Sequence, residues 1–424
     1  MDEMIRDRMH EALEVEPPPF GLRARVVGSI PMDDRSSRRP SRRSFQWAPG
    51  LVAILLAIAV IAGLIYVRGA VIPQSHNARP RVAPTGRVLA PDGVLVTSNG
   101  TVYLSDFGSG YVFRLTSTGS LATVAGRAQA AMLSQGSAGD NGSATEAYLF
   151  GPEGLAADGS GNLFVADFVG ERVRRIDRHG VITTIAGSGR ADMPSPNLSG
   201  DGGPATAATL NGPTALAFDR AGVLYVADAG NHRVRRIDAR GTITSLDLSS
   251  WSQSNVWSPA GLAFDNAGDL YVADWSGCQV VRISTGNLVS IVAGTGTCGF
   301  GGDGDRAASA ELGGPSGIAF DSTGNLYIAD HNNHRVRRVD SQGIVTTVAG
   351  TGRTGYTGDG GQATSAETGY PNDVAISQSG VLYIAEGTCT CPAAPTATPG
   401  RLRMLQLSSG TITTVAYSGS IVTW

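Results

Sequence analysis

The sequence contains no lysine, so all 33 of its basic side chains are arginines. A Gly-x-x-x-x-Gly-Lys phosphate loop therefore cannot occur, and no Gly-x-Ser-x-Gly elbow of a serine hydrolase is present either. Cysteine is scarce, at four residues, and none is placed with histidine and asparagine as a cysteine nucleophile requires. These absences exclude the commonest nucleotide-binding loop and two common covalent nucleophiles.

Charged residues make up only 16% of the chain and aromatic residues only 6%, whereas glycine occurs 57 times. This composition is typical of many short strands joined by tight turns. A chain of 424 residues is also long enough to bury a large core. The composition therefore favours an all-β fold.

A five-residue strand-like phrase recurs six times along the chain. The copies are Val102–Asp106, Leu163–Asp167, Leu224–Asp228, Leu270–Asp274, Leu326–Asp330 and Leu382–Glu386. Around each copy lie four runs of β-branched and aromatic residues, bounded by Gly, Asn, Asp or Ser. The pattern predicts a six-bladed β-propeller of four-stranded antiparallel blades, at about 92–126, 152–187, 213–247, 259–294, 315–350 and 371–417.

The last blade already includes its own outer strand, near 411–416. We therefore expect residues 81–90 or 420–424 to add a further edge strand that covers the seam, because unpaired strand edges promote aggregation.

An apolar run of about 20 residues, 48–67, is long enough to cross the roughly 30 Å hydrocarbon core as a helix. The alternative is a cleaved signal peptide, but the segment ahead of the run is long for one and no small-x-small cleavage site follows it. Five arginines crowd just ahead of the run: Arg35, Arg38, Arg39, Arg42 and Arg43. The positive-inside rule then predicts a cytoplasmic N-terminus and a propeller outside the membrane.

The predicted organisation is a partly disordered cytoplasmic tail (1–46), a single transmembrane helix (48–67), a linker (68–82) and the propeller (83–424). The tail has too little apolar surface to fold alone, and a cytoplasmic partner for it stays open. We expect a single-pass protein of the cell membrane.

Two stretches within the repeats carry a distinctive phrase, Ala227-Asp228-Ala229-Gly230-Asn231-His232-Arg233-Val234 and Ala329-Asp330-His331-Asn332-Asn333-His334-Arg335-Val336. The phrase resembles the hallmark of the NHL-repeat family, and the Gly-Asp-Gly-Gly linkers at 200–203 and 358–361 look like those of bacterial and teneurin-type NHL propellers. The resemblance implies a propeller used mostly for binding, with a minority of relatives that are metal-dependent lyases or hydrolases. Blades 1, 4 and 6 depart from the phrase.

In a four-stranded blade, the turn between strands 2 and 3 and the connection to the next blade emerge on the same face. The long insertions of this chain are of those two kinds, so we expect the binding site on this loop face. The candidate binding residues there are Asp140, Asp201, Asp303, Asp359, His331 and Trp275.

The loop aspartates have two interpretations. Asp201, Asp303 and Asp359 are the candidate metal ligands, because calcium prefers several oxygens at flexible spacing. The alternative is that each aspartate caps a short helical turn, since alanine-rich residues follow. No cofactor is predicted, and calcium remains the alternative.

The aspartates that end the repeated phrase form the second candidate set. A carboxylate ring at the mouth of the propeller is one interpretation. The other is a turn hydrogen bond, or pairing with Arg172, Arg233 or Arg335 of the following strand. The resemblance to lyase-type relatives also raises a weaker hypothesis, a zinc site at the central channel built from carboxylates and the histidines of the propeller, which are His179, His232, His331 and His334.

All four cysteines follow the predicted membrane span, where an oxidising compartment favours disulfides. We predict a bridge between Cys278 and Cys298, whereas Cys389 and Cys391 pair with each other or stay free. Nucleic acid is not a predicted partner, because the arginine runs alternate along strands and no aromatic residues interleave with them.

The predicted function is therefore a membrane-anchored binding module or sensor for a protein, glycan or cell-wall ligand outside the membrane. The alternative is a metal-dependent lyase or hydrolase with its site at the central channel, so the sequence leaves enzymatic activity undecided.

Overall fold

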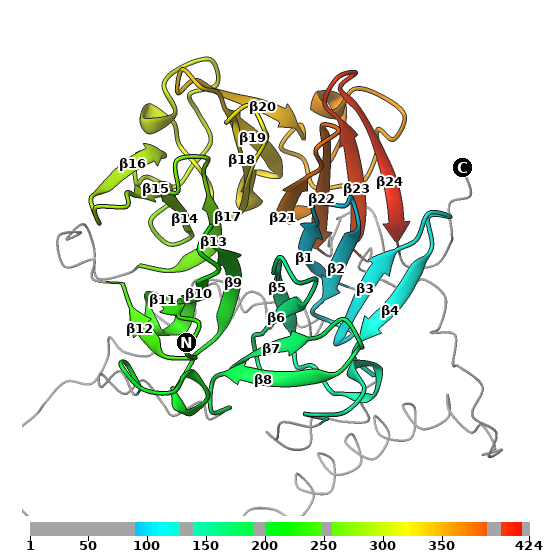
Figure 1. The fold of residues 1–424 in the computed structure, drawn as a ribbon. Coiled ribbons are helices and arrows are strands. Elements are labelled where there is room, and N and C mark those ends of the chain that lie inside the picture. Colours follow the sequence, from blue (N-terminus) through cyan, green and yellow to red (C-terminus); the bar gives the residue numbers. More distant parts are fainter. Residues whose placement is uncertain (1–89, 128–138, 190–199, 247–256, 388–399, 418–424) are drawn as a thin grey trace, which may run out of the picture. The chain divides into compact units, whose positions relative to one another are not determined.

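The computed structural model describes residues 90–127, 139–189, 200–246, 257–387 and 400–417. They form six antiparallel sheets of four strands each, arranged as the blades of a propeller (Figure 1). The predicted all-β, six-bladed architecture is confirmed. Each blade is made of four strands that are consecutive in the sequence, so neighbouring strands are joined by hairpins.

The strands of the first three blades are β1 (Pro91–Val96), β2 (Val102–Asp106), β3 (Tyr111–Leu115) and β4 (Leu121–Ala125); β5 (Pro152–Ala157), β6 (Leu163–Asp167), β7 (Arg172–Ile176) and β8 (Ile182–Ala186); and β9 (Pro213–Phe218), β10 (Leu224–Asp228), β11 (Arg233–Ile237) and β12 (Ile243–Ser245). The strands of the other blades are β13 (Pro259–Phe264), β14 (Leu270–Asp274), β15 (Gln279–Ile283) and β16 (Val289–Ala293); β17 (Pro315–Phe320), β18 (Leu326–Asp330), β19 (Arg335–Val339) and β20 (Val345–Ala349); and β21 (Tyr370–Ile376), β22 (Val381–Gly387), β23 (Arg401–Gln406) and β24 (Thr411–Tyr417).

Short 3-10 turns interrupt the connections. Four of them lie in loops between blades: η1 (Ala144–Glu146), η2 (Ala205–Ala207), η4 (Ala307–Ser309) and η6 (Ala363–Ser365). The other two, η3 (Ala229–Asn231) and η5 (His331–Asn333), lie between strands 2 and 3 of blades 3 and 5.

The core lies between blades, because each sheet buries both of its faces against its neighbours. One apolar cluster joins Phe164 of blade 2 to Leu216 and Val226 of blade 3. Edge-to-face aromatic pairs recur at three successive seams: Phe164 with Phe218 at 4.9 Å, Tyr225 with Phe264 at 5.0 Å, and Tyr271 with Phe320 at 4.7 Å between ring centroids. The innermost strands contact one another in sequence around the ring.

The ring closes between the first and last innermost strands, β1 and β21. The backbone N–H of Val94 donates to Asp373 Oδ2 at 2.9 Å, and Asn372 Nδ2 donates to the carbonyl of Pro91 at 3.0 Å. All four strands of blade 6 come from the C-terminal part of the chain. The predicted extra edge strand falls, apart from Ala90, outside the described residues.

The predicted tail, transmembrane helix and linker, 1–82, also fall outside the described residues. Within the blades and the loops that are described, no helix is long and apolar enough to span a membrane. The membrane anchor therefore stays a prediction.

The predicted disulfide between Cys278 and Cys298 is confirmed, with 5.2 Å between the two Cα atoms. It ties the turn between strands 2 and 3 of blade 4 to the loop that leaves the same blade. Cys389 and Cys391 lie outside the described residues.

Candidate functional site

A buried arginine occupies the third position of the third strand in four of the six blades. These residues are Arg174, Arg235, Arg337 and Arg403, and none exposes more than 1% of its surface. Each binds two carboxylates, one from the loop that precedes its blade and one from the end of its own second strand. We call each such group an arginine centre.

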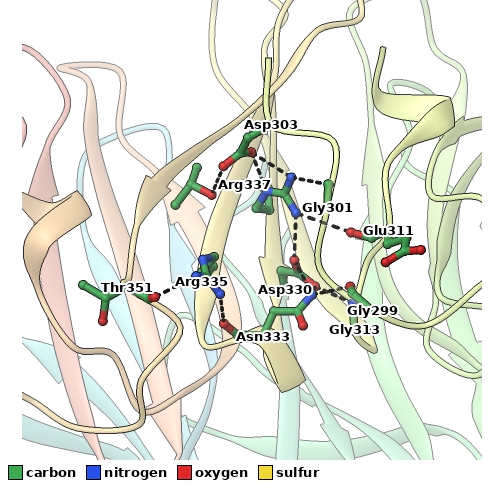
Figure 2. Close-up of polar contacts among 11 residues, drawn as sticks. Gly299, Gly301, Asp303, Glu311, Gly313, Asp330, Asn333, Arg335, Arg337 and Thr351 are labelled. Carbon is green, nitrogen blue, oxygen red and sulfur yellow. Dashed lines mark hydrogen bonds and ion pairs between the residues drawn. The ribbon is translucent and has the colours of Figure 1, made fainter. Parts of the chain in front are cut away.

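Figure 2 shows the arginine centre of blade 5. The guanidinium of Arg337 lies 2.7 Å from Asp303 Oδ1 and 3.2 Å from Asp330 Oδ2. It also donates to the backbone carbonyls of Gly301, at 3.1 Å, and Glu311, at 3.4 Å. One side chain of the blade therefore holds the preceding loop at several points.

The other three centres repeat this geometry. Their N–O distances are 2.7 Å for Arg174 to Asp140 and 3.5 Å to Asp167, 2.6 Å for Arg235 to Asp201 and 3.3 Å to Asp228, and 2.7 Å for Arg403 to Asp359 and 3.7 Å to Glu386.

The glycine before each loop aspartate is required by the backbone. Gly302 has φ +80°, and a Cβ there would lie 2.8 Å from the Cα of Ala310. The equivalent Gly200 has φ +106° and would place a Cβ 2.6 Å from the Cα of Ala208. A side chain would be both strained and obstructed at this position, so the Gly-Asp pair aims the carboxylate at the arginine.

Blades 1 and 4 lack the arginine. The same strand position is taken by Phe113 in blade 1 and Val281 in blade 4, both buried. The sequence just ahead of these two blades also has no Gly-Asp-Gly or Gly-Asp-Asn-Gly segment. The loop aspartate and the strand arginine therefore occur together, a correlation that the sequence contains and that the repeat analysis above missed.

The helix-capping prediction for the loop aspartates is wrong. The N-cap residues of the four inter-blade turns are Ser143, Pro204, Arg306 and Gln362, and none makes a side-chain capping hydrogen bond. The aspartates bind the arginines instead. Leaving a buried guanidinium without a negative partner costs more free energy than leaving an exposed 3-10 turn without a cap.

Among the strand-end aspartates, turn hydrogen bonds are confirmed for Asp106 and Asp274, whose Oδ1 atoms accept from the N–H groups of Ser109 and Gly277, both at 3.1 Å. Asp330 Oδ1 accepts instead from the N–H of Gly313 in the preceding loop, at 2.7 Å. The predicted arginine partner is wrong by two residues. Arg335 lies directly opposite Asp330 in the sheet, but its guanidinium donates to the carbonyls of Asn333 and Thr351 (Figure 2). Arg337, on the same face of the strand, takes the carboxylate instead.

In the four arginine centres, burial raises the pKa of the strand-end carboxyl even though each faces an arginine. The pKa of Asp167 rises to about 6 and that of Glu386 to about 7, in both cases mainly through desolvation. The nearby Arg174 and Arg403 counteract the shift. The arginine centres are therefore desolvated ion pairs, as is typical of ion pairs with a structural role.

The candidate metal ligands Asp201, Asp303 and Asp359 each direct a carboxylate oxygen to an arginine, which supplies the positive charge that a cation would have supplied. No group of three or more His, Cys, Asp or Glu with an arrangement suited to a metal occurs in the part of the chain that the structure describes. The structure also keeps the four loop aspartates apart, on four different blades.

His331 and Trp275, by contrast, are brought together on the loop face. Their ring centroids lie 4.7 Å apart, and Tyr370 contacts His331 at 5.0 Å. His331 is only 6% exposed and Trp275 only 7%. They form a packed aromatic cluster under the loops and present little surface to a ligand.

A left-handed residue at the turn between strands 2 and 3 fastens four blades to the loop that follows. Glu171, His232, Cys278 and His334 occupy this position, with φ between 49° and 55°. Glu171 accepts from the N–H of Gly212 at 2.7 Å, and the Nδ1 atoms of His232 and His334 bind the carbonyls of Trp257, at 2.5 Å, and Gly369, at 2.9 Å. In blade 4 the Cys278–Cys298 disulfide replaces this contact.

Two of the histidines hypothesised to bind zinc, His232 and His334, are therefore bonded to backbone on different blades. The left-handed turn position places their side chains over the seams and not toward each other.

Phe300 is the exposed aromatic residue of the loop between blades 4 and 5, at 43% exposure. One face of its ring is covered by the guanidinium of Arg335, 3.6 Å from the ring centroid. The loop around it is held by the disulfide at Cys298, by Asn333 Nδ2 donating to the carbonyl of Gly299 at 2.7 Å, and by Arg337. Phe300 is thus displayed by a rigid loop.

The central cavity of the ring is lined by the innermost strands of all six blades and has a volume of about 250 Å³. Most lining residues are glycine, alanine and branched aliphatics, and none of the described ones is His, Cys or Arg. The polar ones include Asp92, Glu153, Thr214, Asn372 and Asp373.

Comparison with known proteins gives two family matches. A model described as the teneurin NHL domain matches residues 121–199 and 289–357, and a model described as the NHL repeat matches residues 210–237. Teneurin-1 of Mus musculus is 32% identical over 276 residues, which cover 56% of this chain and 10% of that protein. Teneurin-4 of Mus musculus is 31% identical over 348 residues, covering 72% of this chain and 12% of that protein. The chain thus spans about a tenth of the length of the teneurins that it matches.

Among solved structures, an auxiliary nutrient binding protein from Bacteroides thetaiotaomicron is similar with a TM-score of 0.52 and 16% identity, over 70% of this chain and 67% of that chain. A structural genomics protein of unknown function from the same organism gives a TM-score of 0.51 and 18% identity, over 74% of this chain and 70% of that chain. At these identities the similarity is one of fold alone.

Replacing the buried arginine of a centre is expected to destabilise the fold. Arg337→Met leaves Asp303 and Asp330 without their buried cation, so the free energy of unfolding should fall by about 3–5 kcal/mol. Arg353→Met, at an exposed position, should change it by less than about 0.5 kcal/mol. Urea unfolding of the full chain, followed by tryptophan fluorescence, measures both values, and equal small effects would contradict the structural role of the centre.

The stability of the protein should fall as pH rises because of Glu171. Burial raises the pKa of Glu171 from 4.5 to about 8, so the folded chain binds more protons than the unfolded chain between these two values. Stability must then decrease with rising pH through this window. Glu171→Gln keeps an acceptor for Gly212 without the charge, and it should raise the melting temperature at pH 9 relative to the wild type but not at pH 5.

The matched control is Glu146→Gln, because that side chain is 71% exposed. Melting curves from pH 5 to pH 9 that differ no more for Glu171→Gln than for Glu146→Gln would show that Glu171 does not titrate as its burial requires.

Proposed function

We propose, from the premise that the chain carries an NHL-repeat β-propeller, as the family matches and the six four-stranded blades support, that it is an interaction module that binds a protein through its loop face. The observation that carries the proposal is the exposed Phe300, which stacks on Arg335 in a loop held by a disulfide, by Asn333 and by Arg337. The resemblance of the repeats to teneurin NHL domains supports an interaction role in general.

The chemistry of this loop suits a protein partner. Aromatic and arginine side chains dominate the binding energy of protein interfaces, especially where they are held in place before binding. The conformation of the loop is already restrained by the disulfide, the arginine centre and the hydrogen bond from Asn333 to Gly299. A partner therefore orders little on binding, so more of the contact energy appears as affinity.

Blade 6 provides the comparison. Tyr356 lies at the equivalent loop position and stacks on Arg401, 3.7 Å from the ring centroid. Its hydroxyl, however, donates to the carbonyl of Gly387, so the ring is tied into the blade and is less exposed than Phe300. The same pair of an aromatic ring and an arginine is therefore packed against the blade in blade 6, whereas in blade 5 the ring is open to solvent.

The proposal places this module outside the cell, on a transmembrane helix formed by residues 48–67. Its support is the length of the apolar run and the arginine cluster ahead of it. The disulfide fits an oxidising compartment. A glycan or cell-wall ligand is the other outcome of the binding test. The enzyme alternative is not favoured, because the described lining of the central cavity offers carboxylates but no histidine or cysteine.

A photo-crosslinking amino acid in place of Phe300 should capture a protein partner in cells that produce the full chain. The matched control is the same amino acid in place of Leu288, which is 74% exposed in the turn between strands 3 and 4, on the opposite face of the propeller. A protein adduct specific to position 300 is the expected result. Adducts at position 288 alone, or at neither position, would contradict binding through the loop face, and capture of a glycan would contradict the protein class.

The membrane proposal predicts that the full chain stays in the membrane pellet after alkaline carbonate washing, because an apolar helix of about 20 residues is not released by high pH. Protease added to intact cells should remove the propeller and leave a fragment that contains residues 1–67. Release of the uncut chain by carbonate, or protection of the propeller until the cells are lysed, would contradict the predicted anchor or its orientation.

A further inference from the structure

The outermost strand of each blade is an edge of its sheet, and in four blades a loop covers this edge. In blade 5 the N–H of Gly304 donates to the carbonyl of Val345 at 2.8 Å, and the N–H of Val345 donates to the carbonyl of Asp305 at 3.0 Å. The residues that make the same exchange in blades 2, 3 and 6 are Ile182, Ile243 and Ile412. All four strand residues are fully buried. These edges are therefore closed to any further strand.

The outer edges of blades 1 and 4, formed by β4 and β16, are open. In the described part of the chain, no loop hydrogen-bonds to the outer edge of either strand. Leu121 and Val289, which correspond to Val345, are only half-buried. The loop ahead of blade 4 runs from Ser245 to Pro259 and is much shorter than the loop ahead of blade 5, from Ala293 to Pro315. The two open edges lie on opposite sides of the ring (Figure 1).

Leu288 distinguishes the open edge of blade 4 from that of blade 1. Val181 and Ile344 occupy the same position, just ahead of the outermost strand, in blades 2 and 5. Each forms a β-bridge with the covering loop and is half-buried. Leu288 forms no such bridge with a described residue, and it is 74% exposed. Blade 1 has the polar Ser120 at this position. Blade 4 therefore keeps the apolar residue of a covered edge but lacks the cover.

The chain around β16 also lacks charge. No charged residue occurs between Arg282 and Asp303. Arg282 itself is paired, because its Nε donates to Asp269 Oδ2 at 2.7 Å. Open strand edges are commonly protected from pairing by charged side chains. The edge of blade 4 has no such protection, and a second uncharged strand can approach it without electrostatic cost.

The backbone of β16 defines how a second strand would pair. Ser290 lies opposite Arg282 of β15, and a bulge follows Ile291. Because strand direction alternates, Val289 and Ile291 direct their N–H and C=O groups outward, as Val345 does in blade 5. The regular part of the edge is therefore Val289–Ile291, and its centre is Ser290.

We propose that β16 pairs in the antiparallel sense with β16 of a second copy of this chain, on a two-fold axis at Ser290. Val289 of each copy then exchanges backbone hydrogen bonds with Ile291 of the other. Each Leu288 comes level with Val292 of the other copy and loses its exposure to water. The pairing continues the four-stranded sheet of blade 4 across the axis into one sheet of eight strands.

A second copy fits this edge for two reasons. Both strands are then uncharged, so no like charges meet across the axis. A two-fold contact uses the same surface on both copies and closes after two chains. Pairing of β16 with the open edge β4 would instead join copies head to tail without closure, and the residue at the end of β4 is the polar Ser120. This surface is separate from the loop that displays Phe300, so the two proposals stand independently.

Ser290→Cys in the full chain tests the axis directly. Opposed residues that do not exchange hydrogen bonds have Cα atoms about 4.5 Å apart, within the range of a disulfide. Mild oxidation of the chain in detergent should give a reducible band at twice the 43.7 kDa mass of one chain. The matched control is Thr346→Cys, at the same strand position on the covered edge of blade 5. It should stay at the level of the wild-type chain.

Leu288→Asp tests the apolar contact without a crosslink. The side chain is exposed in the single chain, so the variant should fold and melt like the wild type. In the pair it replaces two leucines by two carboxylates, and the dimer should weaken on the order of a hundredfold. Light scattering of the full chain over a concentration series measures this shift. Ser117→Asp, exposed in the equivalent turn of blade 1, is the matched control and should leave the dimer unchanged.

Three results would overturn the proposal. One is a wild-type chain that stays monomeric at every concentration. The second is a Ser290→Cys dimer no more abundant than that of Thr346→Cys, together with no effect of Leu288→Asp. The third is a disulfide adduct of Ser290→Cys with a different protein, which would assign the edge to another partner. The chain-to-chain adduct is recognised by its doubled mass and is not confused with the adduct expected at position 300.

Discussion

The pairing of a buried guanidinium with two carboxylates organises the loop face of this propeller. An arginine excluded from water is tolerated only if its charge is compensated and its N–H groups are hydrogen-bonded. Arg337 satisfies this requirement by drawing Asp303 and the carbonyl of Gly301 out of the preceding loop and Asp330 from its own blade. The loop conformation thus follows from the needs of one side chain in the neighbouring sheet. Since four blades repeat the arrangement, most of the long inter-blade loops are anchored by the same physics.

The blades that lack an arginine centre show what else can hold a seam. Blade 4 buries Val281 in place of arginine, and the disulfide from Cys278 to Cys298 fixes the loop that leaves it. Blade 1 buries Phe113, and its seam with blade 6 is joined by Asn372 and by Asp373. Apolar packing stabilises these seams, but a covalent bond or a few hydrogen bonds fix their geometry. The loop between blades 4 and 5 is held by both this disulfide and an arginine centre, and it is the one that displays Phe300.

Most of the residues that were candidates for a functional role instead make contacts that hold the loops to the blades. His232 and His334 bind backbone carbonyls, and the aspartates of the Gly-Asp loops bind arginine. A repeat protein must rebuild the same contact at every seam, so its polar residues recur for reasons of assembly. Residues that depart from the repeated pattern are therefore better indicators of function. Phe300 on its exposed loop is such a departure.

The sequence by itself determined the six blades, their four strands each and the Cys278–Cys298 bridge, because period-two strands, turn residues and repeat spacing are local properties that can be read along the chain. It also indicated turn hydrogen bonds for the strand-end aspartates, which form locally at Asp106 and Asp274. Only the tertiary structure decided which arginine meets which aspartate. Asp303 and Arg337 are 34 residues apart, and Arg335 and Arg337 face the same side of one strand, so the choice between them depends on how deeply each guanidinium is buried against the next loop. The enclosure of Asn372, Asp92 and Glu153 in one cavity likewise exists only after the ends of the ring meet, since closure brings residues about 280 positions apart into contact.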